Sequence, residues 1–253
     1  MIQLKNAQEL AKMRRACQIS AEALKLGGRS IEAGMTTADL DKIIYDYIKR
    51  HGARPNFKGL YGFPGTACIS INDEVIHGIP SHSRQIRPGD IVSIDTGAAI
   101  NGFNGDNACT FPCGKVDIEA QRLMDVTKES LHRGIAAAVA GNRVGDIGHA
   151  VQSYVEENGF SVVRSFVGHG VGKELHEDPE VPNYGHAGHG VRLVNGMTIA
   201  IEPMVNQTHH SVKTLSDGWT VVTADGGLAA HFEHSIAILP GGPEILTIGW
   251  EEP

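Results

Sequence analysis

Two aspartates interrupt a stretch that otherwise has the pattern of a β-hairpin. In "DIVSIDTGAAINGFNGDNACTF", residues 90–111, an apolar run leads to an Asn-Gly pair at 101–102 and then to a second strand-like run. Asn-Gly between such runs is a strong hairpin signal. Aspartate, in contrast, is a poor strand residue and is seldom buried without a partner. Asp95 and Asp106 therefore need a chemical explanation.

The expected strand pairing places both aspartates on one face of the hairpin. With a two-residue turn, position 97 faces 106 and position 95 faces 108, so Asp95 and Asp106 are diagonal neighbours roughly 7–8 Å apart. Two bare carboxylates this close would repel each other, but they suit the oxygen ligands of a divalent cation. For either aspartate alone, a solvated edge or turn position is the alternative.

The C-terminal part of the chain supplies similar groups. Glu202 ends the apolar run "MTIAIE", Glu233 stands in "AAHFEHSIAIL", and His169 lies between glycines in "FVGHGVG". Four carboxylates and one histidine form an oxygen-rich set, which suits hard or borderline divalent ions at a two-metal site better than a thiolate zinc site. An exposed strand face for Glu233, and a structural role for His169 and His176, remain the alternatives.

The elements that would position these residues are related by a faint internal duplication. The helical segment 32–52 aligns with 139–159. The same shift along the chain, without any gap, also aligns the strand that contains Asp95 with the strand that contains Glu202. Each copy has the pattern of two helices followed by strands. A site formed where the two copies meet would take Asp95 from one and Glu202 from the other.

We therefore expect an α+β fold with a central antiparallel sheet and helices on its outer face. The whole chain, residues 1–253, would form a single catalytic domain with two pseudo-twofold-related halves, approximately 1–110 and 111–253.

The composition bounds the compartment and the partners. The 253 residues are 41% hydrophobic and carry a net charge of −7, which fits a globular protein and argues against nucleic acid as a partner. No apolar run approaches the ~18 residues of a membrane span, and the N-terminal segment lacks the apolar stretch of a signal peptide. The four cysteines form no CxxC pair and indicate reduced thiols. We expect a cytoplasmic protein without membrane association.

Several longer motifs carry a family resemblance. They are "CISINDEVIHGIP" (68–80), "GDNACTF" (105–111), "GHGVGKELHEDPEVPNYG" (168–185), "IEPM" (201–204) and "DGWTVVTADGGLAAHFEHS" (217–235). With them the chain resembles the methionine aminopeptidases of the bacterial type I group, which have the pita-bread fold, from about residue 3 to 248. Four residues depart from the usual family pattern, namely Leu60, Tyr61, Asn104 and Cys109.

The resemblance implies a role for individual residues. The implied metal ligands are Asp95, Asp106, His169, Glu202 and Glu233. The implied catalytic residues are His77, His176 and Glu202, of which the two histidines also contact the substrate. The pocket for the methionine side chain would be lined by Phe63, Cys68, His77, Leu175 and Trp219. The implied cofactors are two divalent ions, which could be Co, Mn, Fe or Zn.

The implied activity is removal of the N-terminal methionine from nascent proteins, with a preference for a small second residue. A metal-bridged hydroxide would attack the first peptide bond, and Glu202 would accept the proton of the water. The substrates would be nascent polypeptides at or near the ribosome, and the enzyme would be a monomer.

Two alternatives remain open at this point. A proline-specific aminopeptidase would share the fold, although such enzymes usually carry an additional N-terminal domain. A non-catalytic binding module, such as a nucleic-acid or ribosome-associated adaptor, would be expected to lack metal ligands and to carry basic patches.

Overall fold

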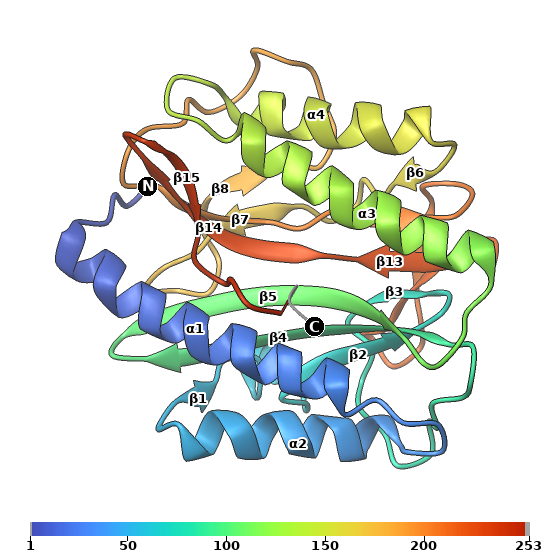
Figure 1. Cartoon of the computed structure of the whole chain (residues 1–253). Coiled ribbons are helices and arrows are strands. Elements are labelled where there is room, and N and C mark those ends of the chain that lie inside the picture. The colour runs from blue at the N-terminus through green and yellow to red at the C-terminus, as the bar shows by residue number, and fades with distance from the viewer. Residues whose placement is uncertain (1, 251–253) are drawn as a thin grey trace.

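The protein, described here as a computed structural model over residues 2–250, has a curved antiparallel sheet with four helices packed on its outer side (Figure 1). The helices are α1 (Ala7–Arg29), α2 (Thr37–Arg50), α3 (Ile118–Ala137) and α4 (Val144–Glu157), with a 3-10 turn η1 (Leu60–Gly62). The strands are β1 (Arg54–Pro55), β2 (Ala67–Ile71), β3 (Glu74–Ile76), β4 (Ile91–Ile100), β5 (Phe103–Pro112), β6 (Ser161–Val162), β7 (Gly168–Gly170), β8 (Glu177–Val181), β9 (Thr198–Ile201), β10 (Met204–Asn206), β11 (Val212–Thr214), β12 (Val221–Thr223), β13 (Ala229–His231), β14 (Glu233–Leu239) and β15 (Gly242–Ile245).

The main sheet joins strands from both ends of the chain. Its order is β1-β4-β5-β14-β9-β7-β8, with β2 also paired to β4 and β15 also paired to β14. Two small sheets, β13-β10-β6 and β11-β12-β3, flank it. The β5–β14 pairing is the seam at which early and late parts of the chain meet.

The expected duplication is visible in the element bounds. Helices α2 and α4 both have 14 residues, and they begin at Thr37 and Val144. Strand β4 begins at Ile91 and β9 at Thr198, so each strand follows the start of its helix at the same distance along the chain. Two helices followed by strands therefore occur twice, whereas the single catalytic domain and its division near residue 110 stay predictions.

Helix starts follow from local sequence. Asn6 caps α1 in a capping box with Glu9, and Thr36 caps α2 in the same way with Asp39. Each box satisfies backbone N–H groups that have no partner within the helix.

The helices cover one face of the sheet, so the opposite face is left for the acidic residues. A methyl group placed on Gly27 of α1 would lie 3.4 Å from Ile94, and one on Gly134 of α3 would lie 3.4 Å from Ile201. Ile94 and Ile201 thus point toward the helices. Because successive strand residues point to opposite faces, their neighbours Asp95 and Glu202 point away from the helices.

A continuous apolar cluster fills the space between helices and sheet and includes Leu24, Ile44, Ile94, Leu123 and Ile201. No helix within residues 2–250 is both long and apolar enough to cross a membrane.

Candidate metal centre and adjoining cavity

The β4–β5 hairpin has the register that its turn predicts. Ten residue pairs run from Ile91–Pro112 to Ile100–Phe103, with Gly97 opposite Asp106 and Asp95 opposite Ala108. Asn101 and Gly102 take φ values of 55° and 78°, as a type I′ turn requires. Asp95 and Asp106 therefore share the face that lies away from α1.

The remaining predicted ligands come from three other strands. Glu233 of β14 lies opposite Ala108, which itself lies opposite Asp95, so the three residues form one row across the sheet. Glu202 follows directly after β9, the next strand along, and His169 is the middle residue of β7. The fold thus brings all five predicted ligands to the inner face of the sheet.

Three of these side chains already have the spacing of a metal site. Ligand atoms of Asp106, His169 and Glu233 all lie within 4.8 Å of one another. The Nε2 atom of His169 is 3.7 Å from Asp106 Oδ2 and 3.6 Å from Glu202 Oε1. Its Nδ1 lies 2.8 Å from the carbonyl oxygen of Gly170. Because a carbonyl only accepts, Nδ1 carries the hydrogen, and Nε2 presents its lone pair to the carboxylates.

The carboxylates are buried without partners of their own. Asp95 Oδ1, Asp106 Oδ1 and Glu233 Oε1 have no hydrogen-bond partner within residues 2–250, and Asp106 and Glu233 are only 3% and 2% exposed. Such groups are costly unless they are paired or bind cations.

The electrostatics agree with cation binding. Burial, and then repulsion from Asp106, raises the pKa of Asp95, Glu202 and Glu233 well above the usual range, and burial raises the pKa of Asp106 to about 7. Divalent cations would remove this repulsion and satisfy the orphaned oxygens. The donor set, four carboxylates and one imidazole, therefore fits divalent metal ions.

A cavity of about 560 Å³ opens above this cluster. Its lining includes all five residues predicted for the methionine pocket, which are His77 and the four apolar residues Phe63, Cys68, Leu175 and Trp219. These four form one apolar cluster with Phe57 and Leu60. The ring of Phe63 meets that of Trp219 edge to face at 5.1 Å. The structure thus places an apolar slot directly beside the acidic cluster.

The two predicted substrate-contacting histidines lie at different depths in the cavity. His77 is half-buried, takes a left-handed φ of 59°, and packs edge-on against Phe166 at 5.7 Å. Its burial lowers its pKa to about 4. His176 is exposed at the mouth, with its ring 4.5 Å from that of His169 and parallel to Tyr61 at 6.3 Å.

Several residues near the site were not predicted. Phe57, Phe166 and Tyr61 line the cavity, and no local pattern marks them because they lie in loops or turns. His231 is different. It is 1% exposed, and its Nε2 lies 3.7 Å from Glu202 Oε2. Strand alternation would have placed it on the same face as Glu233.

Two of the four departures from the family pattern, Asn104 and Cys109, lie in different surroundings. The Asn104 amide donates to the carbonyl oxygens of Gly172 and Lys173 at 3.1 Å and 2.9 Å, which ties β5 to the segment that precedes His176. Cys109 is three residues from Asp106 on the same strand, so it points to the other face, where it lines a separate hollow.

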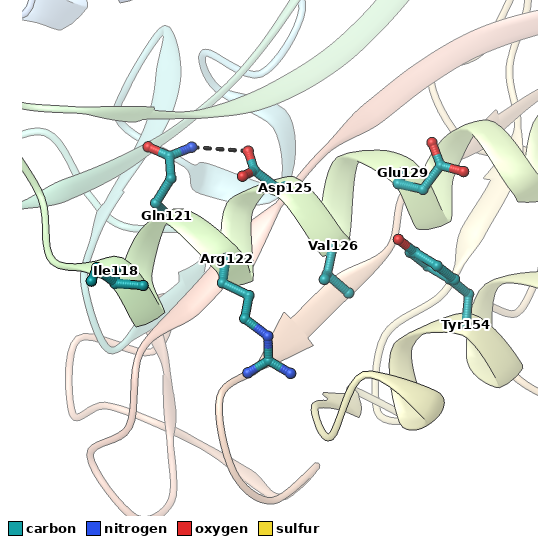
Figure 2. A pocket seen from close by; sticks show the side chains of 7 residues that line it. All are labelled: Ile118, Gln121, Arg122, Asp125, Val126, Glu129 and Tyr154. Atoms are coloured by element: carbon teal, nitrogen blue, oxygen red, sulfur yellow. Dashed lines mark hydrogen bonds between the residues drawn. The ribbon is translucent and has the colours of Figure 1, made fainter.

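A second large hollow, on the outer helix layer, has no such chemistry. It lies beside α3, has a volume of about 580 Å³, and is lined by Ile118, Gln121, Arg122, Asp125, Val126, Glu129 and Tyr154 (Figure 2). Its polar groups already have protein partners, as in the 2.9 Å bond from Gln121 to Asp125 and the 3.0 Å bond from Arg122 to Glu119. The acidic cluster on the inner face is therefore the better candidate site.

Comparison with known proteins agrees with this arrangement. The model of metallopeptidase family M24 matches residues 11–240. A methionine aminopeptidase of Clostridium perfringens is 55% identical over 98% of this chain and 99% of its own length, and methionine aminopeptidase 1 of Bacillus subtilis is 51% identical over the same shares. The crystal structure of a Thermotoga maritima methionine aminopeptidase superposes with a TM-score of 0.96 at 45% identity, over 98% of this chain and 99% of that one.

The chain therefore belongs to metallopeptidase family M24. It is a metal-dependent hydrolase, and its nearly full-length relatives named above are methionine aminopeptidases. A prolidase of Pyrococcus furiosus shares the fold at a TM-score of 0.78, over 97% of this chain and 65% of the prolidase, with 22% identity. The predicted pita-bread fold, with helices outside a curved antiparallel sheet, is confirmed.

Proposed function

We propose that this enzyme hydrolyses the first peptide bond of polypeptides that begin with methionine and that it prefers a small second residue. The observation that carries the proposal is the direct contact between the acidic cluster and the apolar slot. A buried set of cation ligands forms the floor of a cavity whose wall is made of aromatic and sulfur-containing side chains.

The acidic cluster would hold two divalent ions, for which Co, Mn, Fe and Zn all suit the donor set. The residues that would hold them are Asp95, Asp106, His169, Glu202 and Glu233. Ions bound there would polarise the carbonyl group of the scissile bond and make a bound water more acidic.

The slot fits an unbranched thioether. Phe63 and Trp219 present an edge-to-face pair, and Cys68 and Leu175 complete the apolar wall. The sulfur atom of a methionine side chain is stabilised by contact with aromatic rings at a distance of ~5 Å. The slot therefore selects the first side chain, while the free α-amino group of the substrate would bind near one of the metal ions, which would restrict cleavage to the first bond.

Three side chains act on the attacking water and the substrate. Glu202, in its ionised form, accepts a proton from the attacking water and delivers it toward the leaving amine. His176, at the mouth, donates a hydrogen bond to the oxygen that gains negative charge. His77, neutral because its pKa is lowered to about 4, packs beside the position of the second residue. Crowding by the His77 and His176 rings would favour a small second side chain.

We also propose that the enzyme acts as a monomer in the cytoplasm, on nascent chains at or near the ribosome. What supports a reducing compartment is that Cys17, Cys68, Cys109 and Cys113 form no disulfide with one another.

Hydrolysis of Met-Ala-Ser with added Mn²⁺ or Co²⁺ tests the proposal, with Ala-Pro as the competing substrate. We expect cleavage of the first and not of the second. Preferential cleavage of Ala-Pro would instead indicate a proline-specific enzyme, and failure to bind Mn²⁺ at all would favour a non-catalytic binding module. Glu202→Gln should abolish turnover, and near wild-type turnover in this variant would refute its role as proton acceptor.

A further inference from the structure

His231 is a buried histidine to which the chemistry above gives no role. It ends strand β13 and is 1% exposed. Its Nε2 atom has no hydrogen-bond partner within residues 2–250, yet lies 3.7 Å from Glu202 Oε2. A buried polar atom without a partner is uncommon in native proteins and calls for an explanation.

The Glu202 carboxylate stands between two imidazole rings. His169 Nε2 is 3.6 Å from one oxygen, Oε1, and His231 Nε2 is 3.7 Å from the other, Oε2. At 3.7 Å the second pair lies just beyond hydrogen-bond range, and a small rotation of the carboxyl group closes the gap. The two rings therefore lie on either side of this carboxylate and limit its rotation.

The backbone of His231 is held firmly on both sides. Its N–H donates to Thr110 Oγ1 at 2.9 Å, and the Thr110 hydroxyl donates to the His231 carbonyl oxygen at 3.0 Å. On its other side, His231 pairs in register with Met204, which lies two residues beyond Glu202. The His231 ring therefore starts from a fixed backbone position, from which it can orient the Glu202 side chain.

His231 meets the site at Glu202, and its ring does not line the cavity itself. The described lining of the cavity includes Glu202 and His77, whereas His231 lies beneath them and is not part of that lining. A neutral imidazole has one ring N–H, which can donate a hydrogen bond to a carboxylate and brings no positive charge to a site for cations.

We propose that His231 is a positioning residue for Glu202, whose Nε2–H holds Oε2 so that Oε1 stays turned toward His169 and the metal site. The inference rests on the proposed role of Glu202 as ligand and proton acceptor. Partners of this kind, behind a metal-site carboxylate, typically alter metal affinity or activity by about 10–100-fold.

Two substitutions at this position separate donation from packing. His231→Gln keeps an N–H donor near the position of Nε2, and His231→Leu fills similar space without a donor. Phe232→Leu is the matched control, since Phe232 is also buried but packs against Trp250, with ring centroids 6.0 Å apart. Each variant is measured for kcat and KM on Met-Ala-Ser, for Mn²⁺ binding by calorimetry, and for the visible spectrum of the Co²⁺ form.

For His231→Leu we expect kcat to fall about 10–100-fold with KM within about twofold, weaker Mn²⁺ binding and a changed Co²⁺ spectrum. His231→Gln should recover most of each loss, and Phe232→Leu should leave all three readouts in place. Equal losses in the Gln and Leu variants would overturn the proposal. So would an unchanged kcat in His231→Leu, or the outright loss of one bound Mn²⁺, which would make His231 a ligand.

A double variant tests whether His231 acts through Glu202. If His231 acts through Glu202, adding His231→Leu to Glu202→Gln should weaken Mn²⁺ binding no further. An additive loss would overturn the positioning role. If the wild-type protein failed to cleave Met-Ala-Ser, the proposed function would fail, while Mn²⁺ binding and the Co²⁺ spectrum would still decide the role of His231.

Discussion

The β4–β5 hairpin and the C-terminal strands supply the acidic cluster in different ways. The hairpin carries Asp95 and Asp106 on two adjacent strands joined by ten consecutive residue pairs and a two-residue turn. The C-terminal contribution comes from three separate strands, and one of them, β7, has only three residues. The first pair is preformed by local pairing, whereas the second group depends on packing between distant segments.

The close packing around β7 shows how strongly the position of His169 depends on neighbouring strands. A methyl group on Gly168 would lie 2.4 Å from the Ala200 carbonyl oxygen, and one on Gly170 would lie 2.2 Å from the Asp178 carbonyl oxygen. Both are backbone contacts that cannot move aside cheaply. His169 is therefore held by two glycines that let β7 approach its neighbours closely, while the hairpin tip has open space around Gly102.

Between the two regions, the larger effect on metal binding should come from the hairpin residue that lies at the centre of the cluster. Asp106 repels Asp95, Glu202 and Glu233, so its carboxylate is close to every other one. Asp106→Asn should lower kcat by at least about 10²–10³-fold and weaken Mn²⁺ binding, measured by calorimetry, more than Glu233→Gln does. The reverse order would place the centre of the cluster in the C-terminal strands.

Glycine substitutions should separate the two regions next. Gly168→Ala forces β7 away from β9, so we expect weaker Mn²⁺ binding together with a lower melting temperature. Gly102→Ala meets nothing within 4 Å but keeps a φ of 78°, which costs about 1 kcal/mol. That lowers the melting temperature by about 2–4 °C. Weaker Mn²⁺ binding in Gly168→Ala than in Gly102→Ala would support the view that the C-terminal ligands depend on close strand packing. Equal affinities would contradict it.

The pH dependence of stability should reveal the repulsion within the cluster. The pKa of Asp106 is raised to about 7 in the folded state, so above pH 6.5 the folded metal-free protein binds more protons than the unfolded chain. Its free energy of unfolding therefore falls as pH rises from 6.5 to 8.5. With a folded-state pKa of about 7, Asp106 accounts for a loss of about 1 kcal/mol over this range, so we expect the melting temperature of the metal-free protein to drop by about 2–4 °C.

Two controls accompany that measurement. Saturating Mn²⁺ should remove the drop, since cations replace protons on the carboxylates, and Asp106→Asn should make it shallower. Below pH 6.5 the buried histidines act in the opposite direction, because their pKa values are lowered to about 4 for His77 and His169. A melting temperature that stayed level from pH 6.5 to 8.5 without metal would show that the carboxylates do not share charge as described.

The smallest effect should come from the apolar slot that lies beside both regions. Cys68 is 5% exposed and pairs in register with Asp95. Cys68→Ser places a more polar group in the slot and should raise KM for Met-Ala-Ser about two- to fivefold with little change in kcat. Cys113→Ser, at a buried position outside the cavity, should leave KM where it is. A similar rise in both variants would mean that Cys68 does not contact the methionine side chain.

Much of the N-terminal contribution was predictable because it is local. The Asn101-Gly102 turn determines the register, and the register determines that Asp95 and Asp106 share a face. The constant offset between the two copies predicted the correspondence of α2 with α4 and of β4 with β9 for the same reason, since apolar periodicity and helix caps are encoded within short segments.

The sequence by itself thus determined the hairpin, the repeated helices, the kinds of ligand and, through its motifs, the family. Only the tertiary structure decided that His169, Glu202 and Glu233 meet Asp106 within a few ångströms, and that His231 lies behind Glu202 without lining the cavity. The physical reason is that these contacts join segments that lie far apart along the chain. Their geometry depends on how closely strands can approach, as at Gly168, and no short stretch of sequence encodes that distance.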